Sequence, residues 1–529
     1  MTDDERRERS GDGPDGTDSE PATAPDESTD SNGSLTEGSL AWPMLHLAWP
    51  IVVFQLLQVT YNLADTLWLG QLSADAVGAI SLAFPLVFLL IALAGGFTTA
   101  GSILVAQYTG ADSEQSAGLF AGQTLAFVGV LALVLGIVGY FYTEPALALL
   151  PSDAETADRV IPLAAAYMKI FFLGLPFMFG FYVFEALMRG YGNTQIPMRI
   201  MFVSVVINVA IDPILIFGFT DNPLFVWLGL TGAEASLYAL TGFAGWGIEG
   251  AAVATVFSRG VAAVLGVYVL FATPLGPDVK LSHLRLDPEN VWEITRLGVP
   301  TSLEQSASAL ALVFLTAMVV SFAPPVVAAY GLGNRLISLV FLPAFGLSRA
   351  AETTVGQNLG AGKPDRAARA VKLAAGVGGV VMLGVAVVAV IFAAPINSIF
   401  IGADDPDAAE TIALATDYLR IRSVEFAFIG VMQVVLGAFR GAGNTKTAMA
   451  FSWLNLWGVR VPAVYLLAFT FGWGATGLWV GMSLGHIVGA VAAVAWFTRG
   501  TWKEAVIEDD VVEDDGSTAP DGTPSDGED

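Results

Sequence analysis

Residues 77–111, VGAISLAFPLVFLLIALAGGFTTAGSILVAQYTGA, recur in altered form as residues 327–361, VAAYGLGNRLISLVFLPAFGLSRAAETTVGQNLGA, at a constant offset of 250 and without a gap. The identical positions include Leu82/Leu332, Leu86/Leu336, Gly96/Gly346, Val105/Val355, Gln107/Gln357 and Gly110/Gly360. Self-similarity of this length indicates an internal structural repeat. The chain is therefore predicted to fold as two related halves.

Shorter matches extend the repeat and locate an insertion. RGYGNT at 189–194 matches RGAGNT at 440–445, and the Trp-Gly pair at 246–247 matches the pair at 473–474 at an offset of only 227. The drop in offset places an extra segment, residues 220–246, in the first half. This segment is apolar but interrupted, so we expect a surface-lying or re-entrant insert rather than a further span.

Composition places both halves in a lipid bilayer. The 529 residues are 54% hydrophobic and only 14% charged, whereas soluble chains carry about 25% charged residues. A helix of about 20 apolar residues crosses a bilayer. Twelve stretches meet this requirement, near 45–69, 76–106, 119–142, 161–188, 197–219, 247–272, 296–321, 326–356, 369–393, 412–439, 447–471 and 474–498.

The distribution of Lys and Arg predicts the orientation. One set of connections carries most of the basic residues, whereas the opposite set carries only Arg159. Cytoplasmic loops are the basic ones, so we expect both termini in the cytoplasm of a multi-pass protein of the cell membrane. Since six spans per half is an even number, a pseudo-twofold axis along the membrane normal is expected to relate the halves.

The predicted fold class is an all-α polytopic membrane protein with twelve transmembrane helices in two six-helix lobes. The predicted domains are an acidic disordered tail over 1–40, an N-lobe over 41–272, a cytoplasmic linker over 273–295, a C-lobe over 296–499 and a second acidic tail over 504–529.

The tails carry most of the negative charge of the chain. Residues 1–40 hold twelve acidic and three basic side chains, and residues 504–529 hold eleven acidic and no basic ones. Both tails nearly lack aromatic residues, so they cannot bury enough apolar surface to fold. We interpret them as solvated segments in a salt-rich cytoplasm, which suggests a halophilic source.

Cysteine is absent, so disulfides and thiol chemistry are excluded. His46, His283 and His486 show no metal-ligand spacing. We therefore expect no cofactor, no zinc site and no nucleic-acid partner, and we expect a monomer that acts on small molecules in the lipid bilayer.

Two acidic residues lie at membrane depth, where a charge costs several kcal/mol. Asp65 lies in the first span and Asp212 in the fifth, and at about 1.5 Å per residue both fall in the outer half of the bilayer. Two carboxylates in one low-dielectric cavity repel each other unless a proton or a cation lies between them. A structural pair, satisfied by Asn and Tyr donors, is the alternative interpretation.

Polar neighbours share the faces of these acids. Gln58 and Tyr61 lie on the stripe of Asp65, Asn208 lies one turn before Asp212, and Thr255 in the sixth span reaches the same depth. Pro213 follows Asp212, removes a backbone donor and predicts a helix kink. In the second half, Leu315 and Val461 lie where the acids would project, so we expect the ion site in the first half alone.

Other charged residues within the spans are expected to pair. Glu185 with Arg189 suits a local salt bridge, and Glu352 with Arg349 and Glu425 with Arg422 suit structural pairs that face the bundle interior. Glu304 lies one turn past Pro300 at the cytoplasmic entry of the seventh span, where structural and gating roles are both open. His486 suits a satisfied interior imidazole.

These motifs resemble those of multidrug and toxic compound extrusion (MATE) transporters. The run Gln-x-x-Tyr-Asn-x-x-Asp-Thr at 58–66 resembles their first helix, Asn-x-x-x-Asp-Pro at 208–213 their fifth, and Gly-Ala-Ala-x-Ala-Thr at 250–255 their sixth. The paired VAQYTGA and VGQNLGA blocks and the two RGxGNT blocks resemble their cytoplasmic loop elements. The resemblance covers roughly residues 45–500 and fits the DNA-damage-inducible-type branch.

The resemblance implies export driven by entry of H⁺ or Na⁺. It implies that Asp65, Asn208, Asp212 and Thr255 bind the coupling cation, and that Gln58, Tyr61 and Asn62 form the polar network around it. The expected function is a secondary antiporter that exports amphipathic cationic compounds by alternating access, and not an enzyme. Glu304 lies too near its helix start to match the acid of another branch.

Two alternative functions remain open at this point. A lipid-linked oligosaccharide flippase of the same superfamily needs a cavity lined with Arg and Lys, and Arg259, Arg335 and Arg460 are few and scattered. An intramembrane aspartyl protease needs two apposed acids, but its Gly-x-Gly-Asp element is absent and Asp212 precedes a proline.

Overall fold

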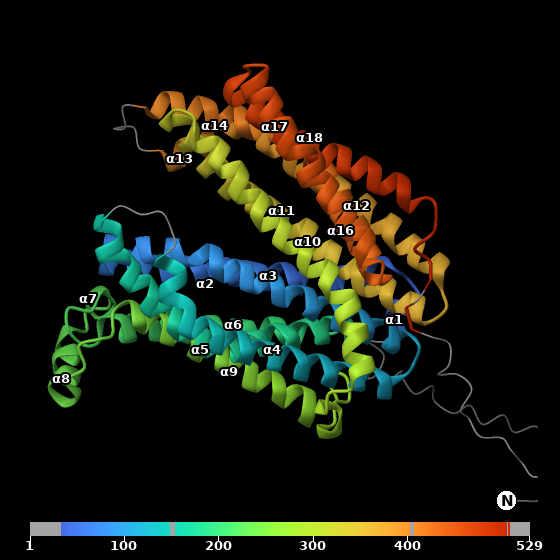
Figure 1. Cartoon of the computed structure of the whole chain (residues 1–529), viewed down its shortest axis with the longest axis horizontal. Coiled ribbons are helices and arrows are strands. Elements are labelled where there is room, and N and C mark those ends of the chain that lie inside the picture. Colours follow the sequence, from blue (N-terminus) through green and yellow to red (C-terminus); the bar gives the residue numbers. More distant parts are fainter. Residues whose placement is uncertain (1–32, 149–153, 402–406, 505, 508–529) are drawn as a thin grey trace, which may run out of the picture.

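The computed structural model describes residues 33–148, 154–401, 407–504 and 506–507, and within these ranges the chain is helical without strands (Figure 1). The long helices of the N-terminal half are α2 (Ala41–Leu72), α3 (Ala74–Gly110), α4 (Glu114–Ala148), α5 (Ala154–Tyr191), α6 (Gln195–Phe217) and α9 (Ile248–Ala272). Those of the C-terminal half are α10 (Pro288–Val320), α11 (Pro324–Gly360), α12 (Pro364–Ile391), α14 (Ala408–Ser423), α15 (Phe426–Gly441), α16 (Thr445–Trp453), η2 (Leu454–Arg460), α17 (Val461–Tyr465), η3 (Leu466–Thr470) and α18 (Gly474–Phe497). The short helices are α1 (Gly33–Thr36), α7 (Pro223–Trp227), α8 (Thr231–Thr241), η1 (Leu281–Leu284) and α13 (Ala393–Phe400).

These helices supply twelve segments long enough to cross a bilayer. In the described residues, 10 single helices are long and apolar enough to span, and α14 with α15 forms one further span bent by 50°. The twelfth is the unbroken helical run from α16 to η3, in which η2 and η3 adopt wider π-helical turns. The twelve predicted spans and the all-helical fold class are thereby confirmed.

The helices form two bundles that converge at one end (Figure 1). One contains α2 to α9, the other α10 to α18, and they separate toward the end where α7, α8 and α13 lie. At the converging end the repeated glycines of α3 and α11 meet the other bundle: a Cβ on Gly110 would lie 1.9 Å from the carbonyl oxygen of Gln357, and one on Gly360 would lie 1.8 Å from that of Gln107. The repeat therefore keeps glycine where the two backbones touch.

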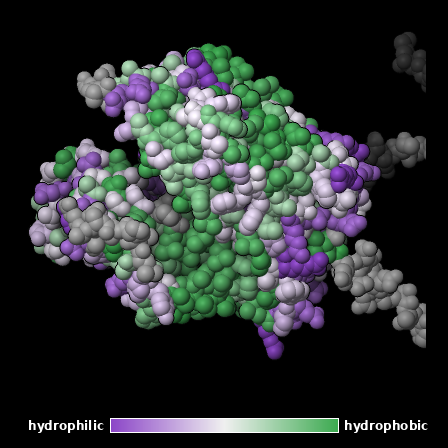
Figure 2. Space-filling view, turned by 45° about the horizontal axis from the view of Figure 1, so that its top comes forward, coloured by the Kyte–Doolittle hydropathy of each residue, from purple (hydrophilic) through white to green (hydrophobic). Residues whose placement is uncertain are grey.

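The outer surface is suited to lipid. Figure 2 shows a broad apolar surface over both bundles, with hydrophilic residues gathered toward the two ends. Many large apolar side chains of the spans are exposed, among them Val130, Leu133, Val264, Leu383 and Val491. Since such an area exceeds what soluble proteins expose, it indicates contact with acyl chains.

The insert at 220–246 does not span the bilayer. It forms α7 and α8, whose apolar residues Trp227, Leu228 and Leu240 are exposed, at the end where the bundles separate (Figure 1). Both helices are too short to cross a bilayer, so the insert adds no further span.

Three predicted boundaries need correction. The stretch 33–40, assigned to a disordered tail, is structured: Leu35 is buried, its carbonyl accepts from Asn358 (3.1 Å), and Arg366 donates to Glu37 (2.6 Å). This short helix could not be predicted from the composition of the tail, because the contacts that stabilise it are made with α11, far away in the sequence. Helix α10 begins at Pro288 rather than near 296, because Asp287 caps it. The start of the predicted C-terminal tail is also ordered, because the Val506 N–H donates to Gln107 (2.8 Å). The rest of the predicted tails, 1–32, 505 and 508–529, lies outside the described residues.

Candidate functional site

Helices α2 and α6 bring the two membrane-depth acids together. Asp65 and Asp212 are buried, on helices that pack against each other, and their carboxyl groups interact electrostatically. Asn208 donates from Nδ2 to Oδ1 of Asp212 (3.1 Å), as their spacing of one turn allows. Thr255 on α9 lines the same cavity as Asp65. All four residues predicted to hold the cation therefore meet at one place.

The oxygen atoms at this place lack ordinary partners. Five buried oxygens have no hydrogen-bond donor or acceptor among the described residues: Tyr61 OH, Asp65 Oδ1, Asn208 Oδ1, Asp212 Oδ2 and Thr255 Oγ1. Buried polar atoms without partners are rare and costly. Oxygen ligands are the ones that hard cations prefer, whereas a proton shared by the two carboxyl groups satisfies only the carboxylate oxygens. The arrangement thus suits H⁺ or Na⁺.

Pro213 does not break its helix. Helix α6 continues past the proline to Phe217, so the helix is not interrupted at the position of the predicted kink. A donor from the insert serves this backbone: Asn222 Nδ2 donates to the carbonyl oxygens of Pro213 (2.8 Å) and Gly218 (2.7 Å). The insert therefore holds the outer end of α6, immediately beyond Asp212.

A cavity of about 400 Å³ opens beside Asp65 within the N-terminal bundle. The predicted polar network lines it: Gln58, Tyr61 and Asn62, with Gln58 Nε2 donating to Asn62 (3.4 Å). The remaining wall is mainly aromatic and apolar, including Phe54, Phe171, Met178 and Tyr182. Such a wall accepts the flat apolar body of an organic compound.

Arg259 and Tyr167 belong to this cavity but were not predicted as site residues. The Arg259 guanidinium donates to Gln58 (2.7 Å) and lies 4.6 Å from the centre of the Tyr61 ring. The Tyr167 hydroxyl lies beside Thr255. Arg259 follows Thr255 by four residues, so the helical spacing was sufficient to predict that both lie on the same face of α9. Tyr167 could not be predicted in this way, because it lies on α5 and reaches the site only through the packing of α5 against α9.

Glu304 lies away from this cavity, in a buried network of ion pairs. Arg440 donates to Glu304 (2.9 Å) and to Glu352 (3.2 Å), and Glu352 also accepts from Arg349 (2.9 Å) and from Arg189 (3.0 Å). The predicted pair of Arg189 with Glu185 is present at 3.1 Å. Arg189, however, also crosses from the N-terminal to the C-terminal bundle, which local spacing did not predict.

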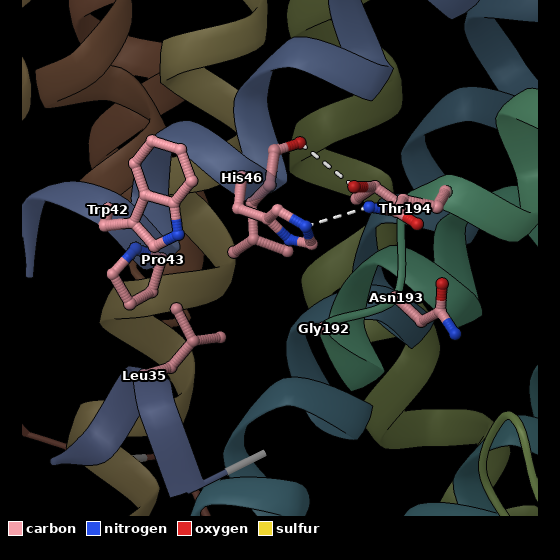
Figure 3. Close-up of a pocket in the computed structure, with 9 residues that line it drawn as sticks. Leu35, Trp42, Pro43, His46, Gly192, Asn193 and Thr194 are labelled. Atoms are coloured by element: carbon pink, nitrogen blue, oxygen red, sulfur yellow. Dashed lines mark hydrogen bonds between the residues drawn. The ribbon is translucent and has the colours of Figure 1, made fainter. Parts of the chain in front are cut away.

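Another cavity, of about 320 Å³, lies where α1, the start of α2 and the α5–α6 connection meet (Figure 3). Thr194 Oγ1 donates to the carbonyl oxygen of Leu47 (3.1 Å), and the His46 ring contacts the Gln195 amide (2.9 Å). It contains none of the predicted site residues, so we assign it no role in transport.

Two lobes of membrane-spanning helices, with a polar pocket buried at membrane depth, define a membrane transporter. The chain belongs to the MATE family, because the MatE family model matches residues 50–214 and 300–466, one match in each half. Family membership excludes the protease alternative. The proximity of Asp65 and Asp212 alone would not exclude it, because an aspartyl protease also needs two neighbouring acids.

Relatives and solved structures agree with this assignment. The probable multidrug resistance protein YoeA of Bacillus subtilis is 29% identical over 87% of this chain and 93% of its own. The FAD transporter of Shewanella oneidensis is 26% identical over 80% of this chain and 87% of its own. A crystal structure of MATE in the straight conformation superposes with a TM-score of 0.78 at 22% identity, covering 90% of this chain and 99% of that one.

Proposed function

We propose that this transporter is a secondary antiporter that exports small amphipathic, cationic organic compounds in exchange for entering H⁺ or Na⁺. The observation that carries this proposal is the convergence of five unpartnered buried oxygens on the Asp65–Asp212 pair, beside an aromatic cavity. Asp65 forms part of both, so a cation at the acids and a compound in the cavity compete for the same carboxylate.

The arrangement of the lobes supports alternating access. The lobes touch at the ends that the Lys and Arg distribution assigns to the cytoplasm and separate at the other ends, which corresponds to an outward-facing state (Figure 1). A cation that enters from outside neutralises the acids and displaces the compound. The emptied carrier then turns inward, provided that the cation binds the two states unequally.

Efflux of the cationic dye rhodamine 123 tests the coupling. Purified protein in proteoliposomes is given a pH gradient or a Na⁺ gradient, and wild type is compared with Asp65→Asn. We expect the variant to lose about tenfold or more of the gradient-driven rate, since it can no longer alternate between a charged and a cation-neutralised state.

Asp278→Asn serves as the matched control. Asp278 is exposed in the linker, where its pair with Lys280 (3.5 Å) is solvated and contributes little. Undiminished gradient-driven efflux by Asp65→Asn would remove the proposed coupling site. The gradient that drives wild-type efflux identifies the ion.

A further inference from the structure

The C-terminal lobe holds a second cavity, of about 300 Å³, at the position related to the first by the internal repeat. Five residues lining one cavity match five residues lining the other at an offset of 250. The pairs are Phe54/Glu304, Gln58/Ser308, Asn62/Leu312, Asp65/Leu315 and Ile91/Phe341. At the offset of 227 that applies to the last span of each half, Arg259 pairs with His486, which also lines its cavity. The fold therefore builds the same pocket twice.

The two acids of the N-lobe site have no counterpart in the C-lobe. Asp65 lines the N-lobe pocket together with Arg259, and the positions that match Asp65 and Asp212 are Leu315 and Val461. The residue before Val461 is Arg460, which lines the C-lobe cavity and has only 11% of its side chain exposed. The structural duplication has thus kept a cavity with an arginine in its wall, while the two acids of the N-lobe site are absent and Glu304 is the acid that lines the C-lobe cavity.

The positive charge of Arg460 is not balanced locally. Glu425, at the bend between α14 and α15, forms an ion pair with Arg422 and lies 3.8 Å from Arg460. The His486 ring contacts both groups, since its Nδ1 lies 2.8 Å from a carboxylate oxygen of Glu425 and 2.5 Å from a guanidinium nitrogen of Arg460. Two guanidinium groups therefore share one carboxylate in a buried setting, which leaves one positive charge for an external anion to neutralise.

Unpartnered polar atoms face this cavity. Arg460 Nε is buried without a hydrogen-bond acceptor among the described residues, which suits an anion, whereas Asn455 Oδ1 is buried without a donor and suits an N–H or O–H group of a bound compound. Both residues lie in η2, the π-helical segment Leu454–Arg460. Such segments are frequent at functional sites. Apolar residues, including Leu312, Met432 and Leu456, line the same cavity.

Glu304 lies in the same cavity wall as a negative group. Its Oε1 is held by Arg440 (2.9 Å), so the ion-pair network, and not Arg460, neutralises it. Its Oε2 lacks a partner among the described residues and can face the positive part of a bound compound.

We propose that the C-lobe cavity binds the carboxylate of an amphipathic organic compound on Arg460, so that the exported compounds include zwitterions that bear a carboxylate. The guanidinium presents a planar fork that matches a carboxylate, and the apolar wall holds the body of the compound. This inference rests on the proposed export function and narrows its substrate class.

Two matched dyes test the proposal. Rhodamine 110 carries a free carboxylate, and rhodamine 123 is its methyl ester. Binding of each dye to the purified full-length protein is measured by fluorescence polarisation. We expect wild type to bind rhodamine 110 more tightly than rhodamine 123. Arg460→Gln is expected to weaken rhodamine 110 binding roughly tenfold to hundredfold, as loss of a charge-assisted pair does, and to leave rhodamine 123 within about twofold.

Further variants separate a binding role from a structural one. Arg460→Lys keeps the charge but loses the fork, so we expect an intermediate loss for rhodamine 110. Arg420→Gln, on the exposed face of α14, removes a comparable charge outside the cavity and is expected to change neither dye. If Arg460→Gln does not fold, the Lys variant and the wild-type preference still decide the question.

Equal affinity of wild type for the two dyes, or equal loss of both in Arg460→Gln, would overturn the proposal. Binding is measured without a gradient, so its result is independent of coupling. If rhodamine 123 is exported along the gradient but the protein shows no preference for the carboxylate dye, this inference is wrong and the proposed function stands. If no export occurs but binding shows an Arg460-dependent preference for rhodamine 110, the proposed function is wrong and the carboxylate site stands.

Discussion

Single oxygen atoms decide what the N-lobe pocket can bind. In the proposed cation site, the carboxyl groups of Asp65 and Asp212 would supply the charge, and the unpartnered neutral oxygens of Asn208 and Thr255 would complete the shell around a cation. A proton needs only the carboxyl groups, whereas Na⁺ needs several oxygen ligands. Thr255 is therefore the residue at which coupling to the two ions should differ.

Thr255→Val tests this distinction without changing the size of the side chain. The variant removes one neutral ligand, so we expect the Na⁺ concentration for half-maximal binding to rise roughly fivefold to tenfold, and proton-driven dye efflux to change little. Cation binding is measured by its protection of the protein against thermal unfolding. Thr60→Val, on the exposed face of the same bundle, is the control. Unchanged protection by Na⁺ would show that the hydroxyl is no ligand.

Among the elements, the insert has the most specific connections to the site. Helix α7 contacts α2 through Trp227, whose ring stacks on Trp68 with centroids 5.1 Å apart. Asn222, at the start of α7, holds α6 at Pro213, and its backbone N–H donates to the buried carboxylate of Glu234 in α8 (2.6 Å). The insert thus joins the two helices that carry Asp65 and Asp212, at the end where the lobes separate.

Asn222→Ala should loosen this connection. The variant leaves the carbonyl oxygens of Pro213 and Gly218 without the Asn222 donor, at a cost of about 1–3 kcal/mol for buried acceptors. We expect a lower melting temperature in detergent and weaker protection by the coupling cation. Ser236→Ala, exposed on α8, should alter neither measurement. A normal melting temperature together with normal protection would show that the insert does not hold α6 in place.

At the scale of the whole molecule, a buried ion pair joins the lobes where they converge. Glu352 of the C-lobe contacts Arg189 of the N-lobe and two further arginines, Arg349 and Arg440. Removing one partner from such a group leaves uncompensated buried charge and costs about 3–5 kcal/mol. Since Arg189 and Arg440 are buried while the lobes touch, the cost falls on the state in which they touch, which is the outward-facing state of the proposed cycle.

Glu352→Gln is therefore expected to populate a state in which the converging ends separate. The chain has no native cysteine, so spin labels at Glu114→Cys and Asp365→Cys, which begin the matching helices α4 and α12, report only on the intended sites. Double electron–electron resonance measures the distance between the two spin labels. We expect one distance population in the protein that carries only the two cysteine substitutions, and an additional, longer distance when Glu352→Gln is added. The exposed Glu410→Gln is the control. A single unchanged distance would exclude a closing role for this ion pair.

Much of the architecture could be predicted because membrane helices are encoded locally. A bilayer requires each span to be apolar and to form all its backbone hydrogen bonds within the helix. The length and number of the spans and their internal repetition can therefore be predicted from the sequence. The same holds for Asp65 and Asp212, since a lone acid in an apolar helix demands a partner. The helical segment 33–36 escaped prediction because its contacts are with a distant helix.

The twelve spans, the two-fold repeat and the acids at membrane depth can all be predicted from the amino-acid sequence, because they follow from hydrophobicity and spacing within single helices. Which side chains share a pocket emerges only when the helices are packed together. Arg259, Tyr167 and Arg460 acquire their surroundings from helices far apart in the chain, and Arg189 meets Glu352 across the two lobes. Such contacts depend on how helices pack and turn about their axes, which no local pattern specifies.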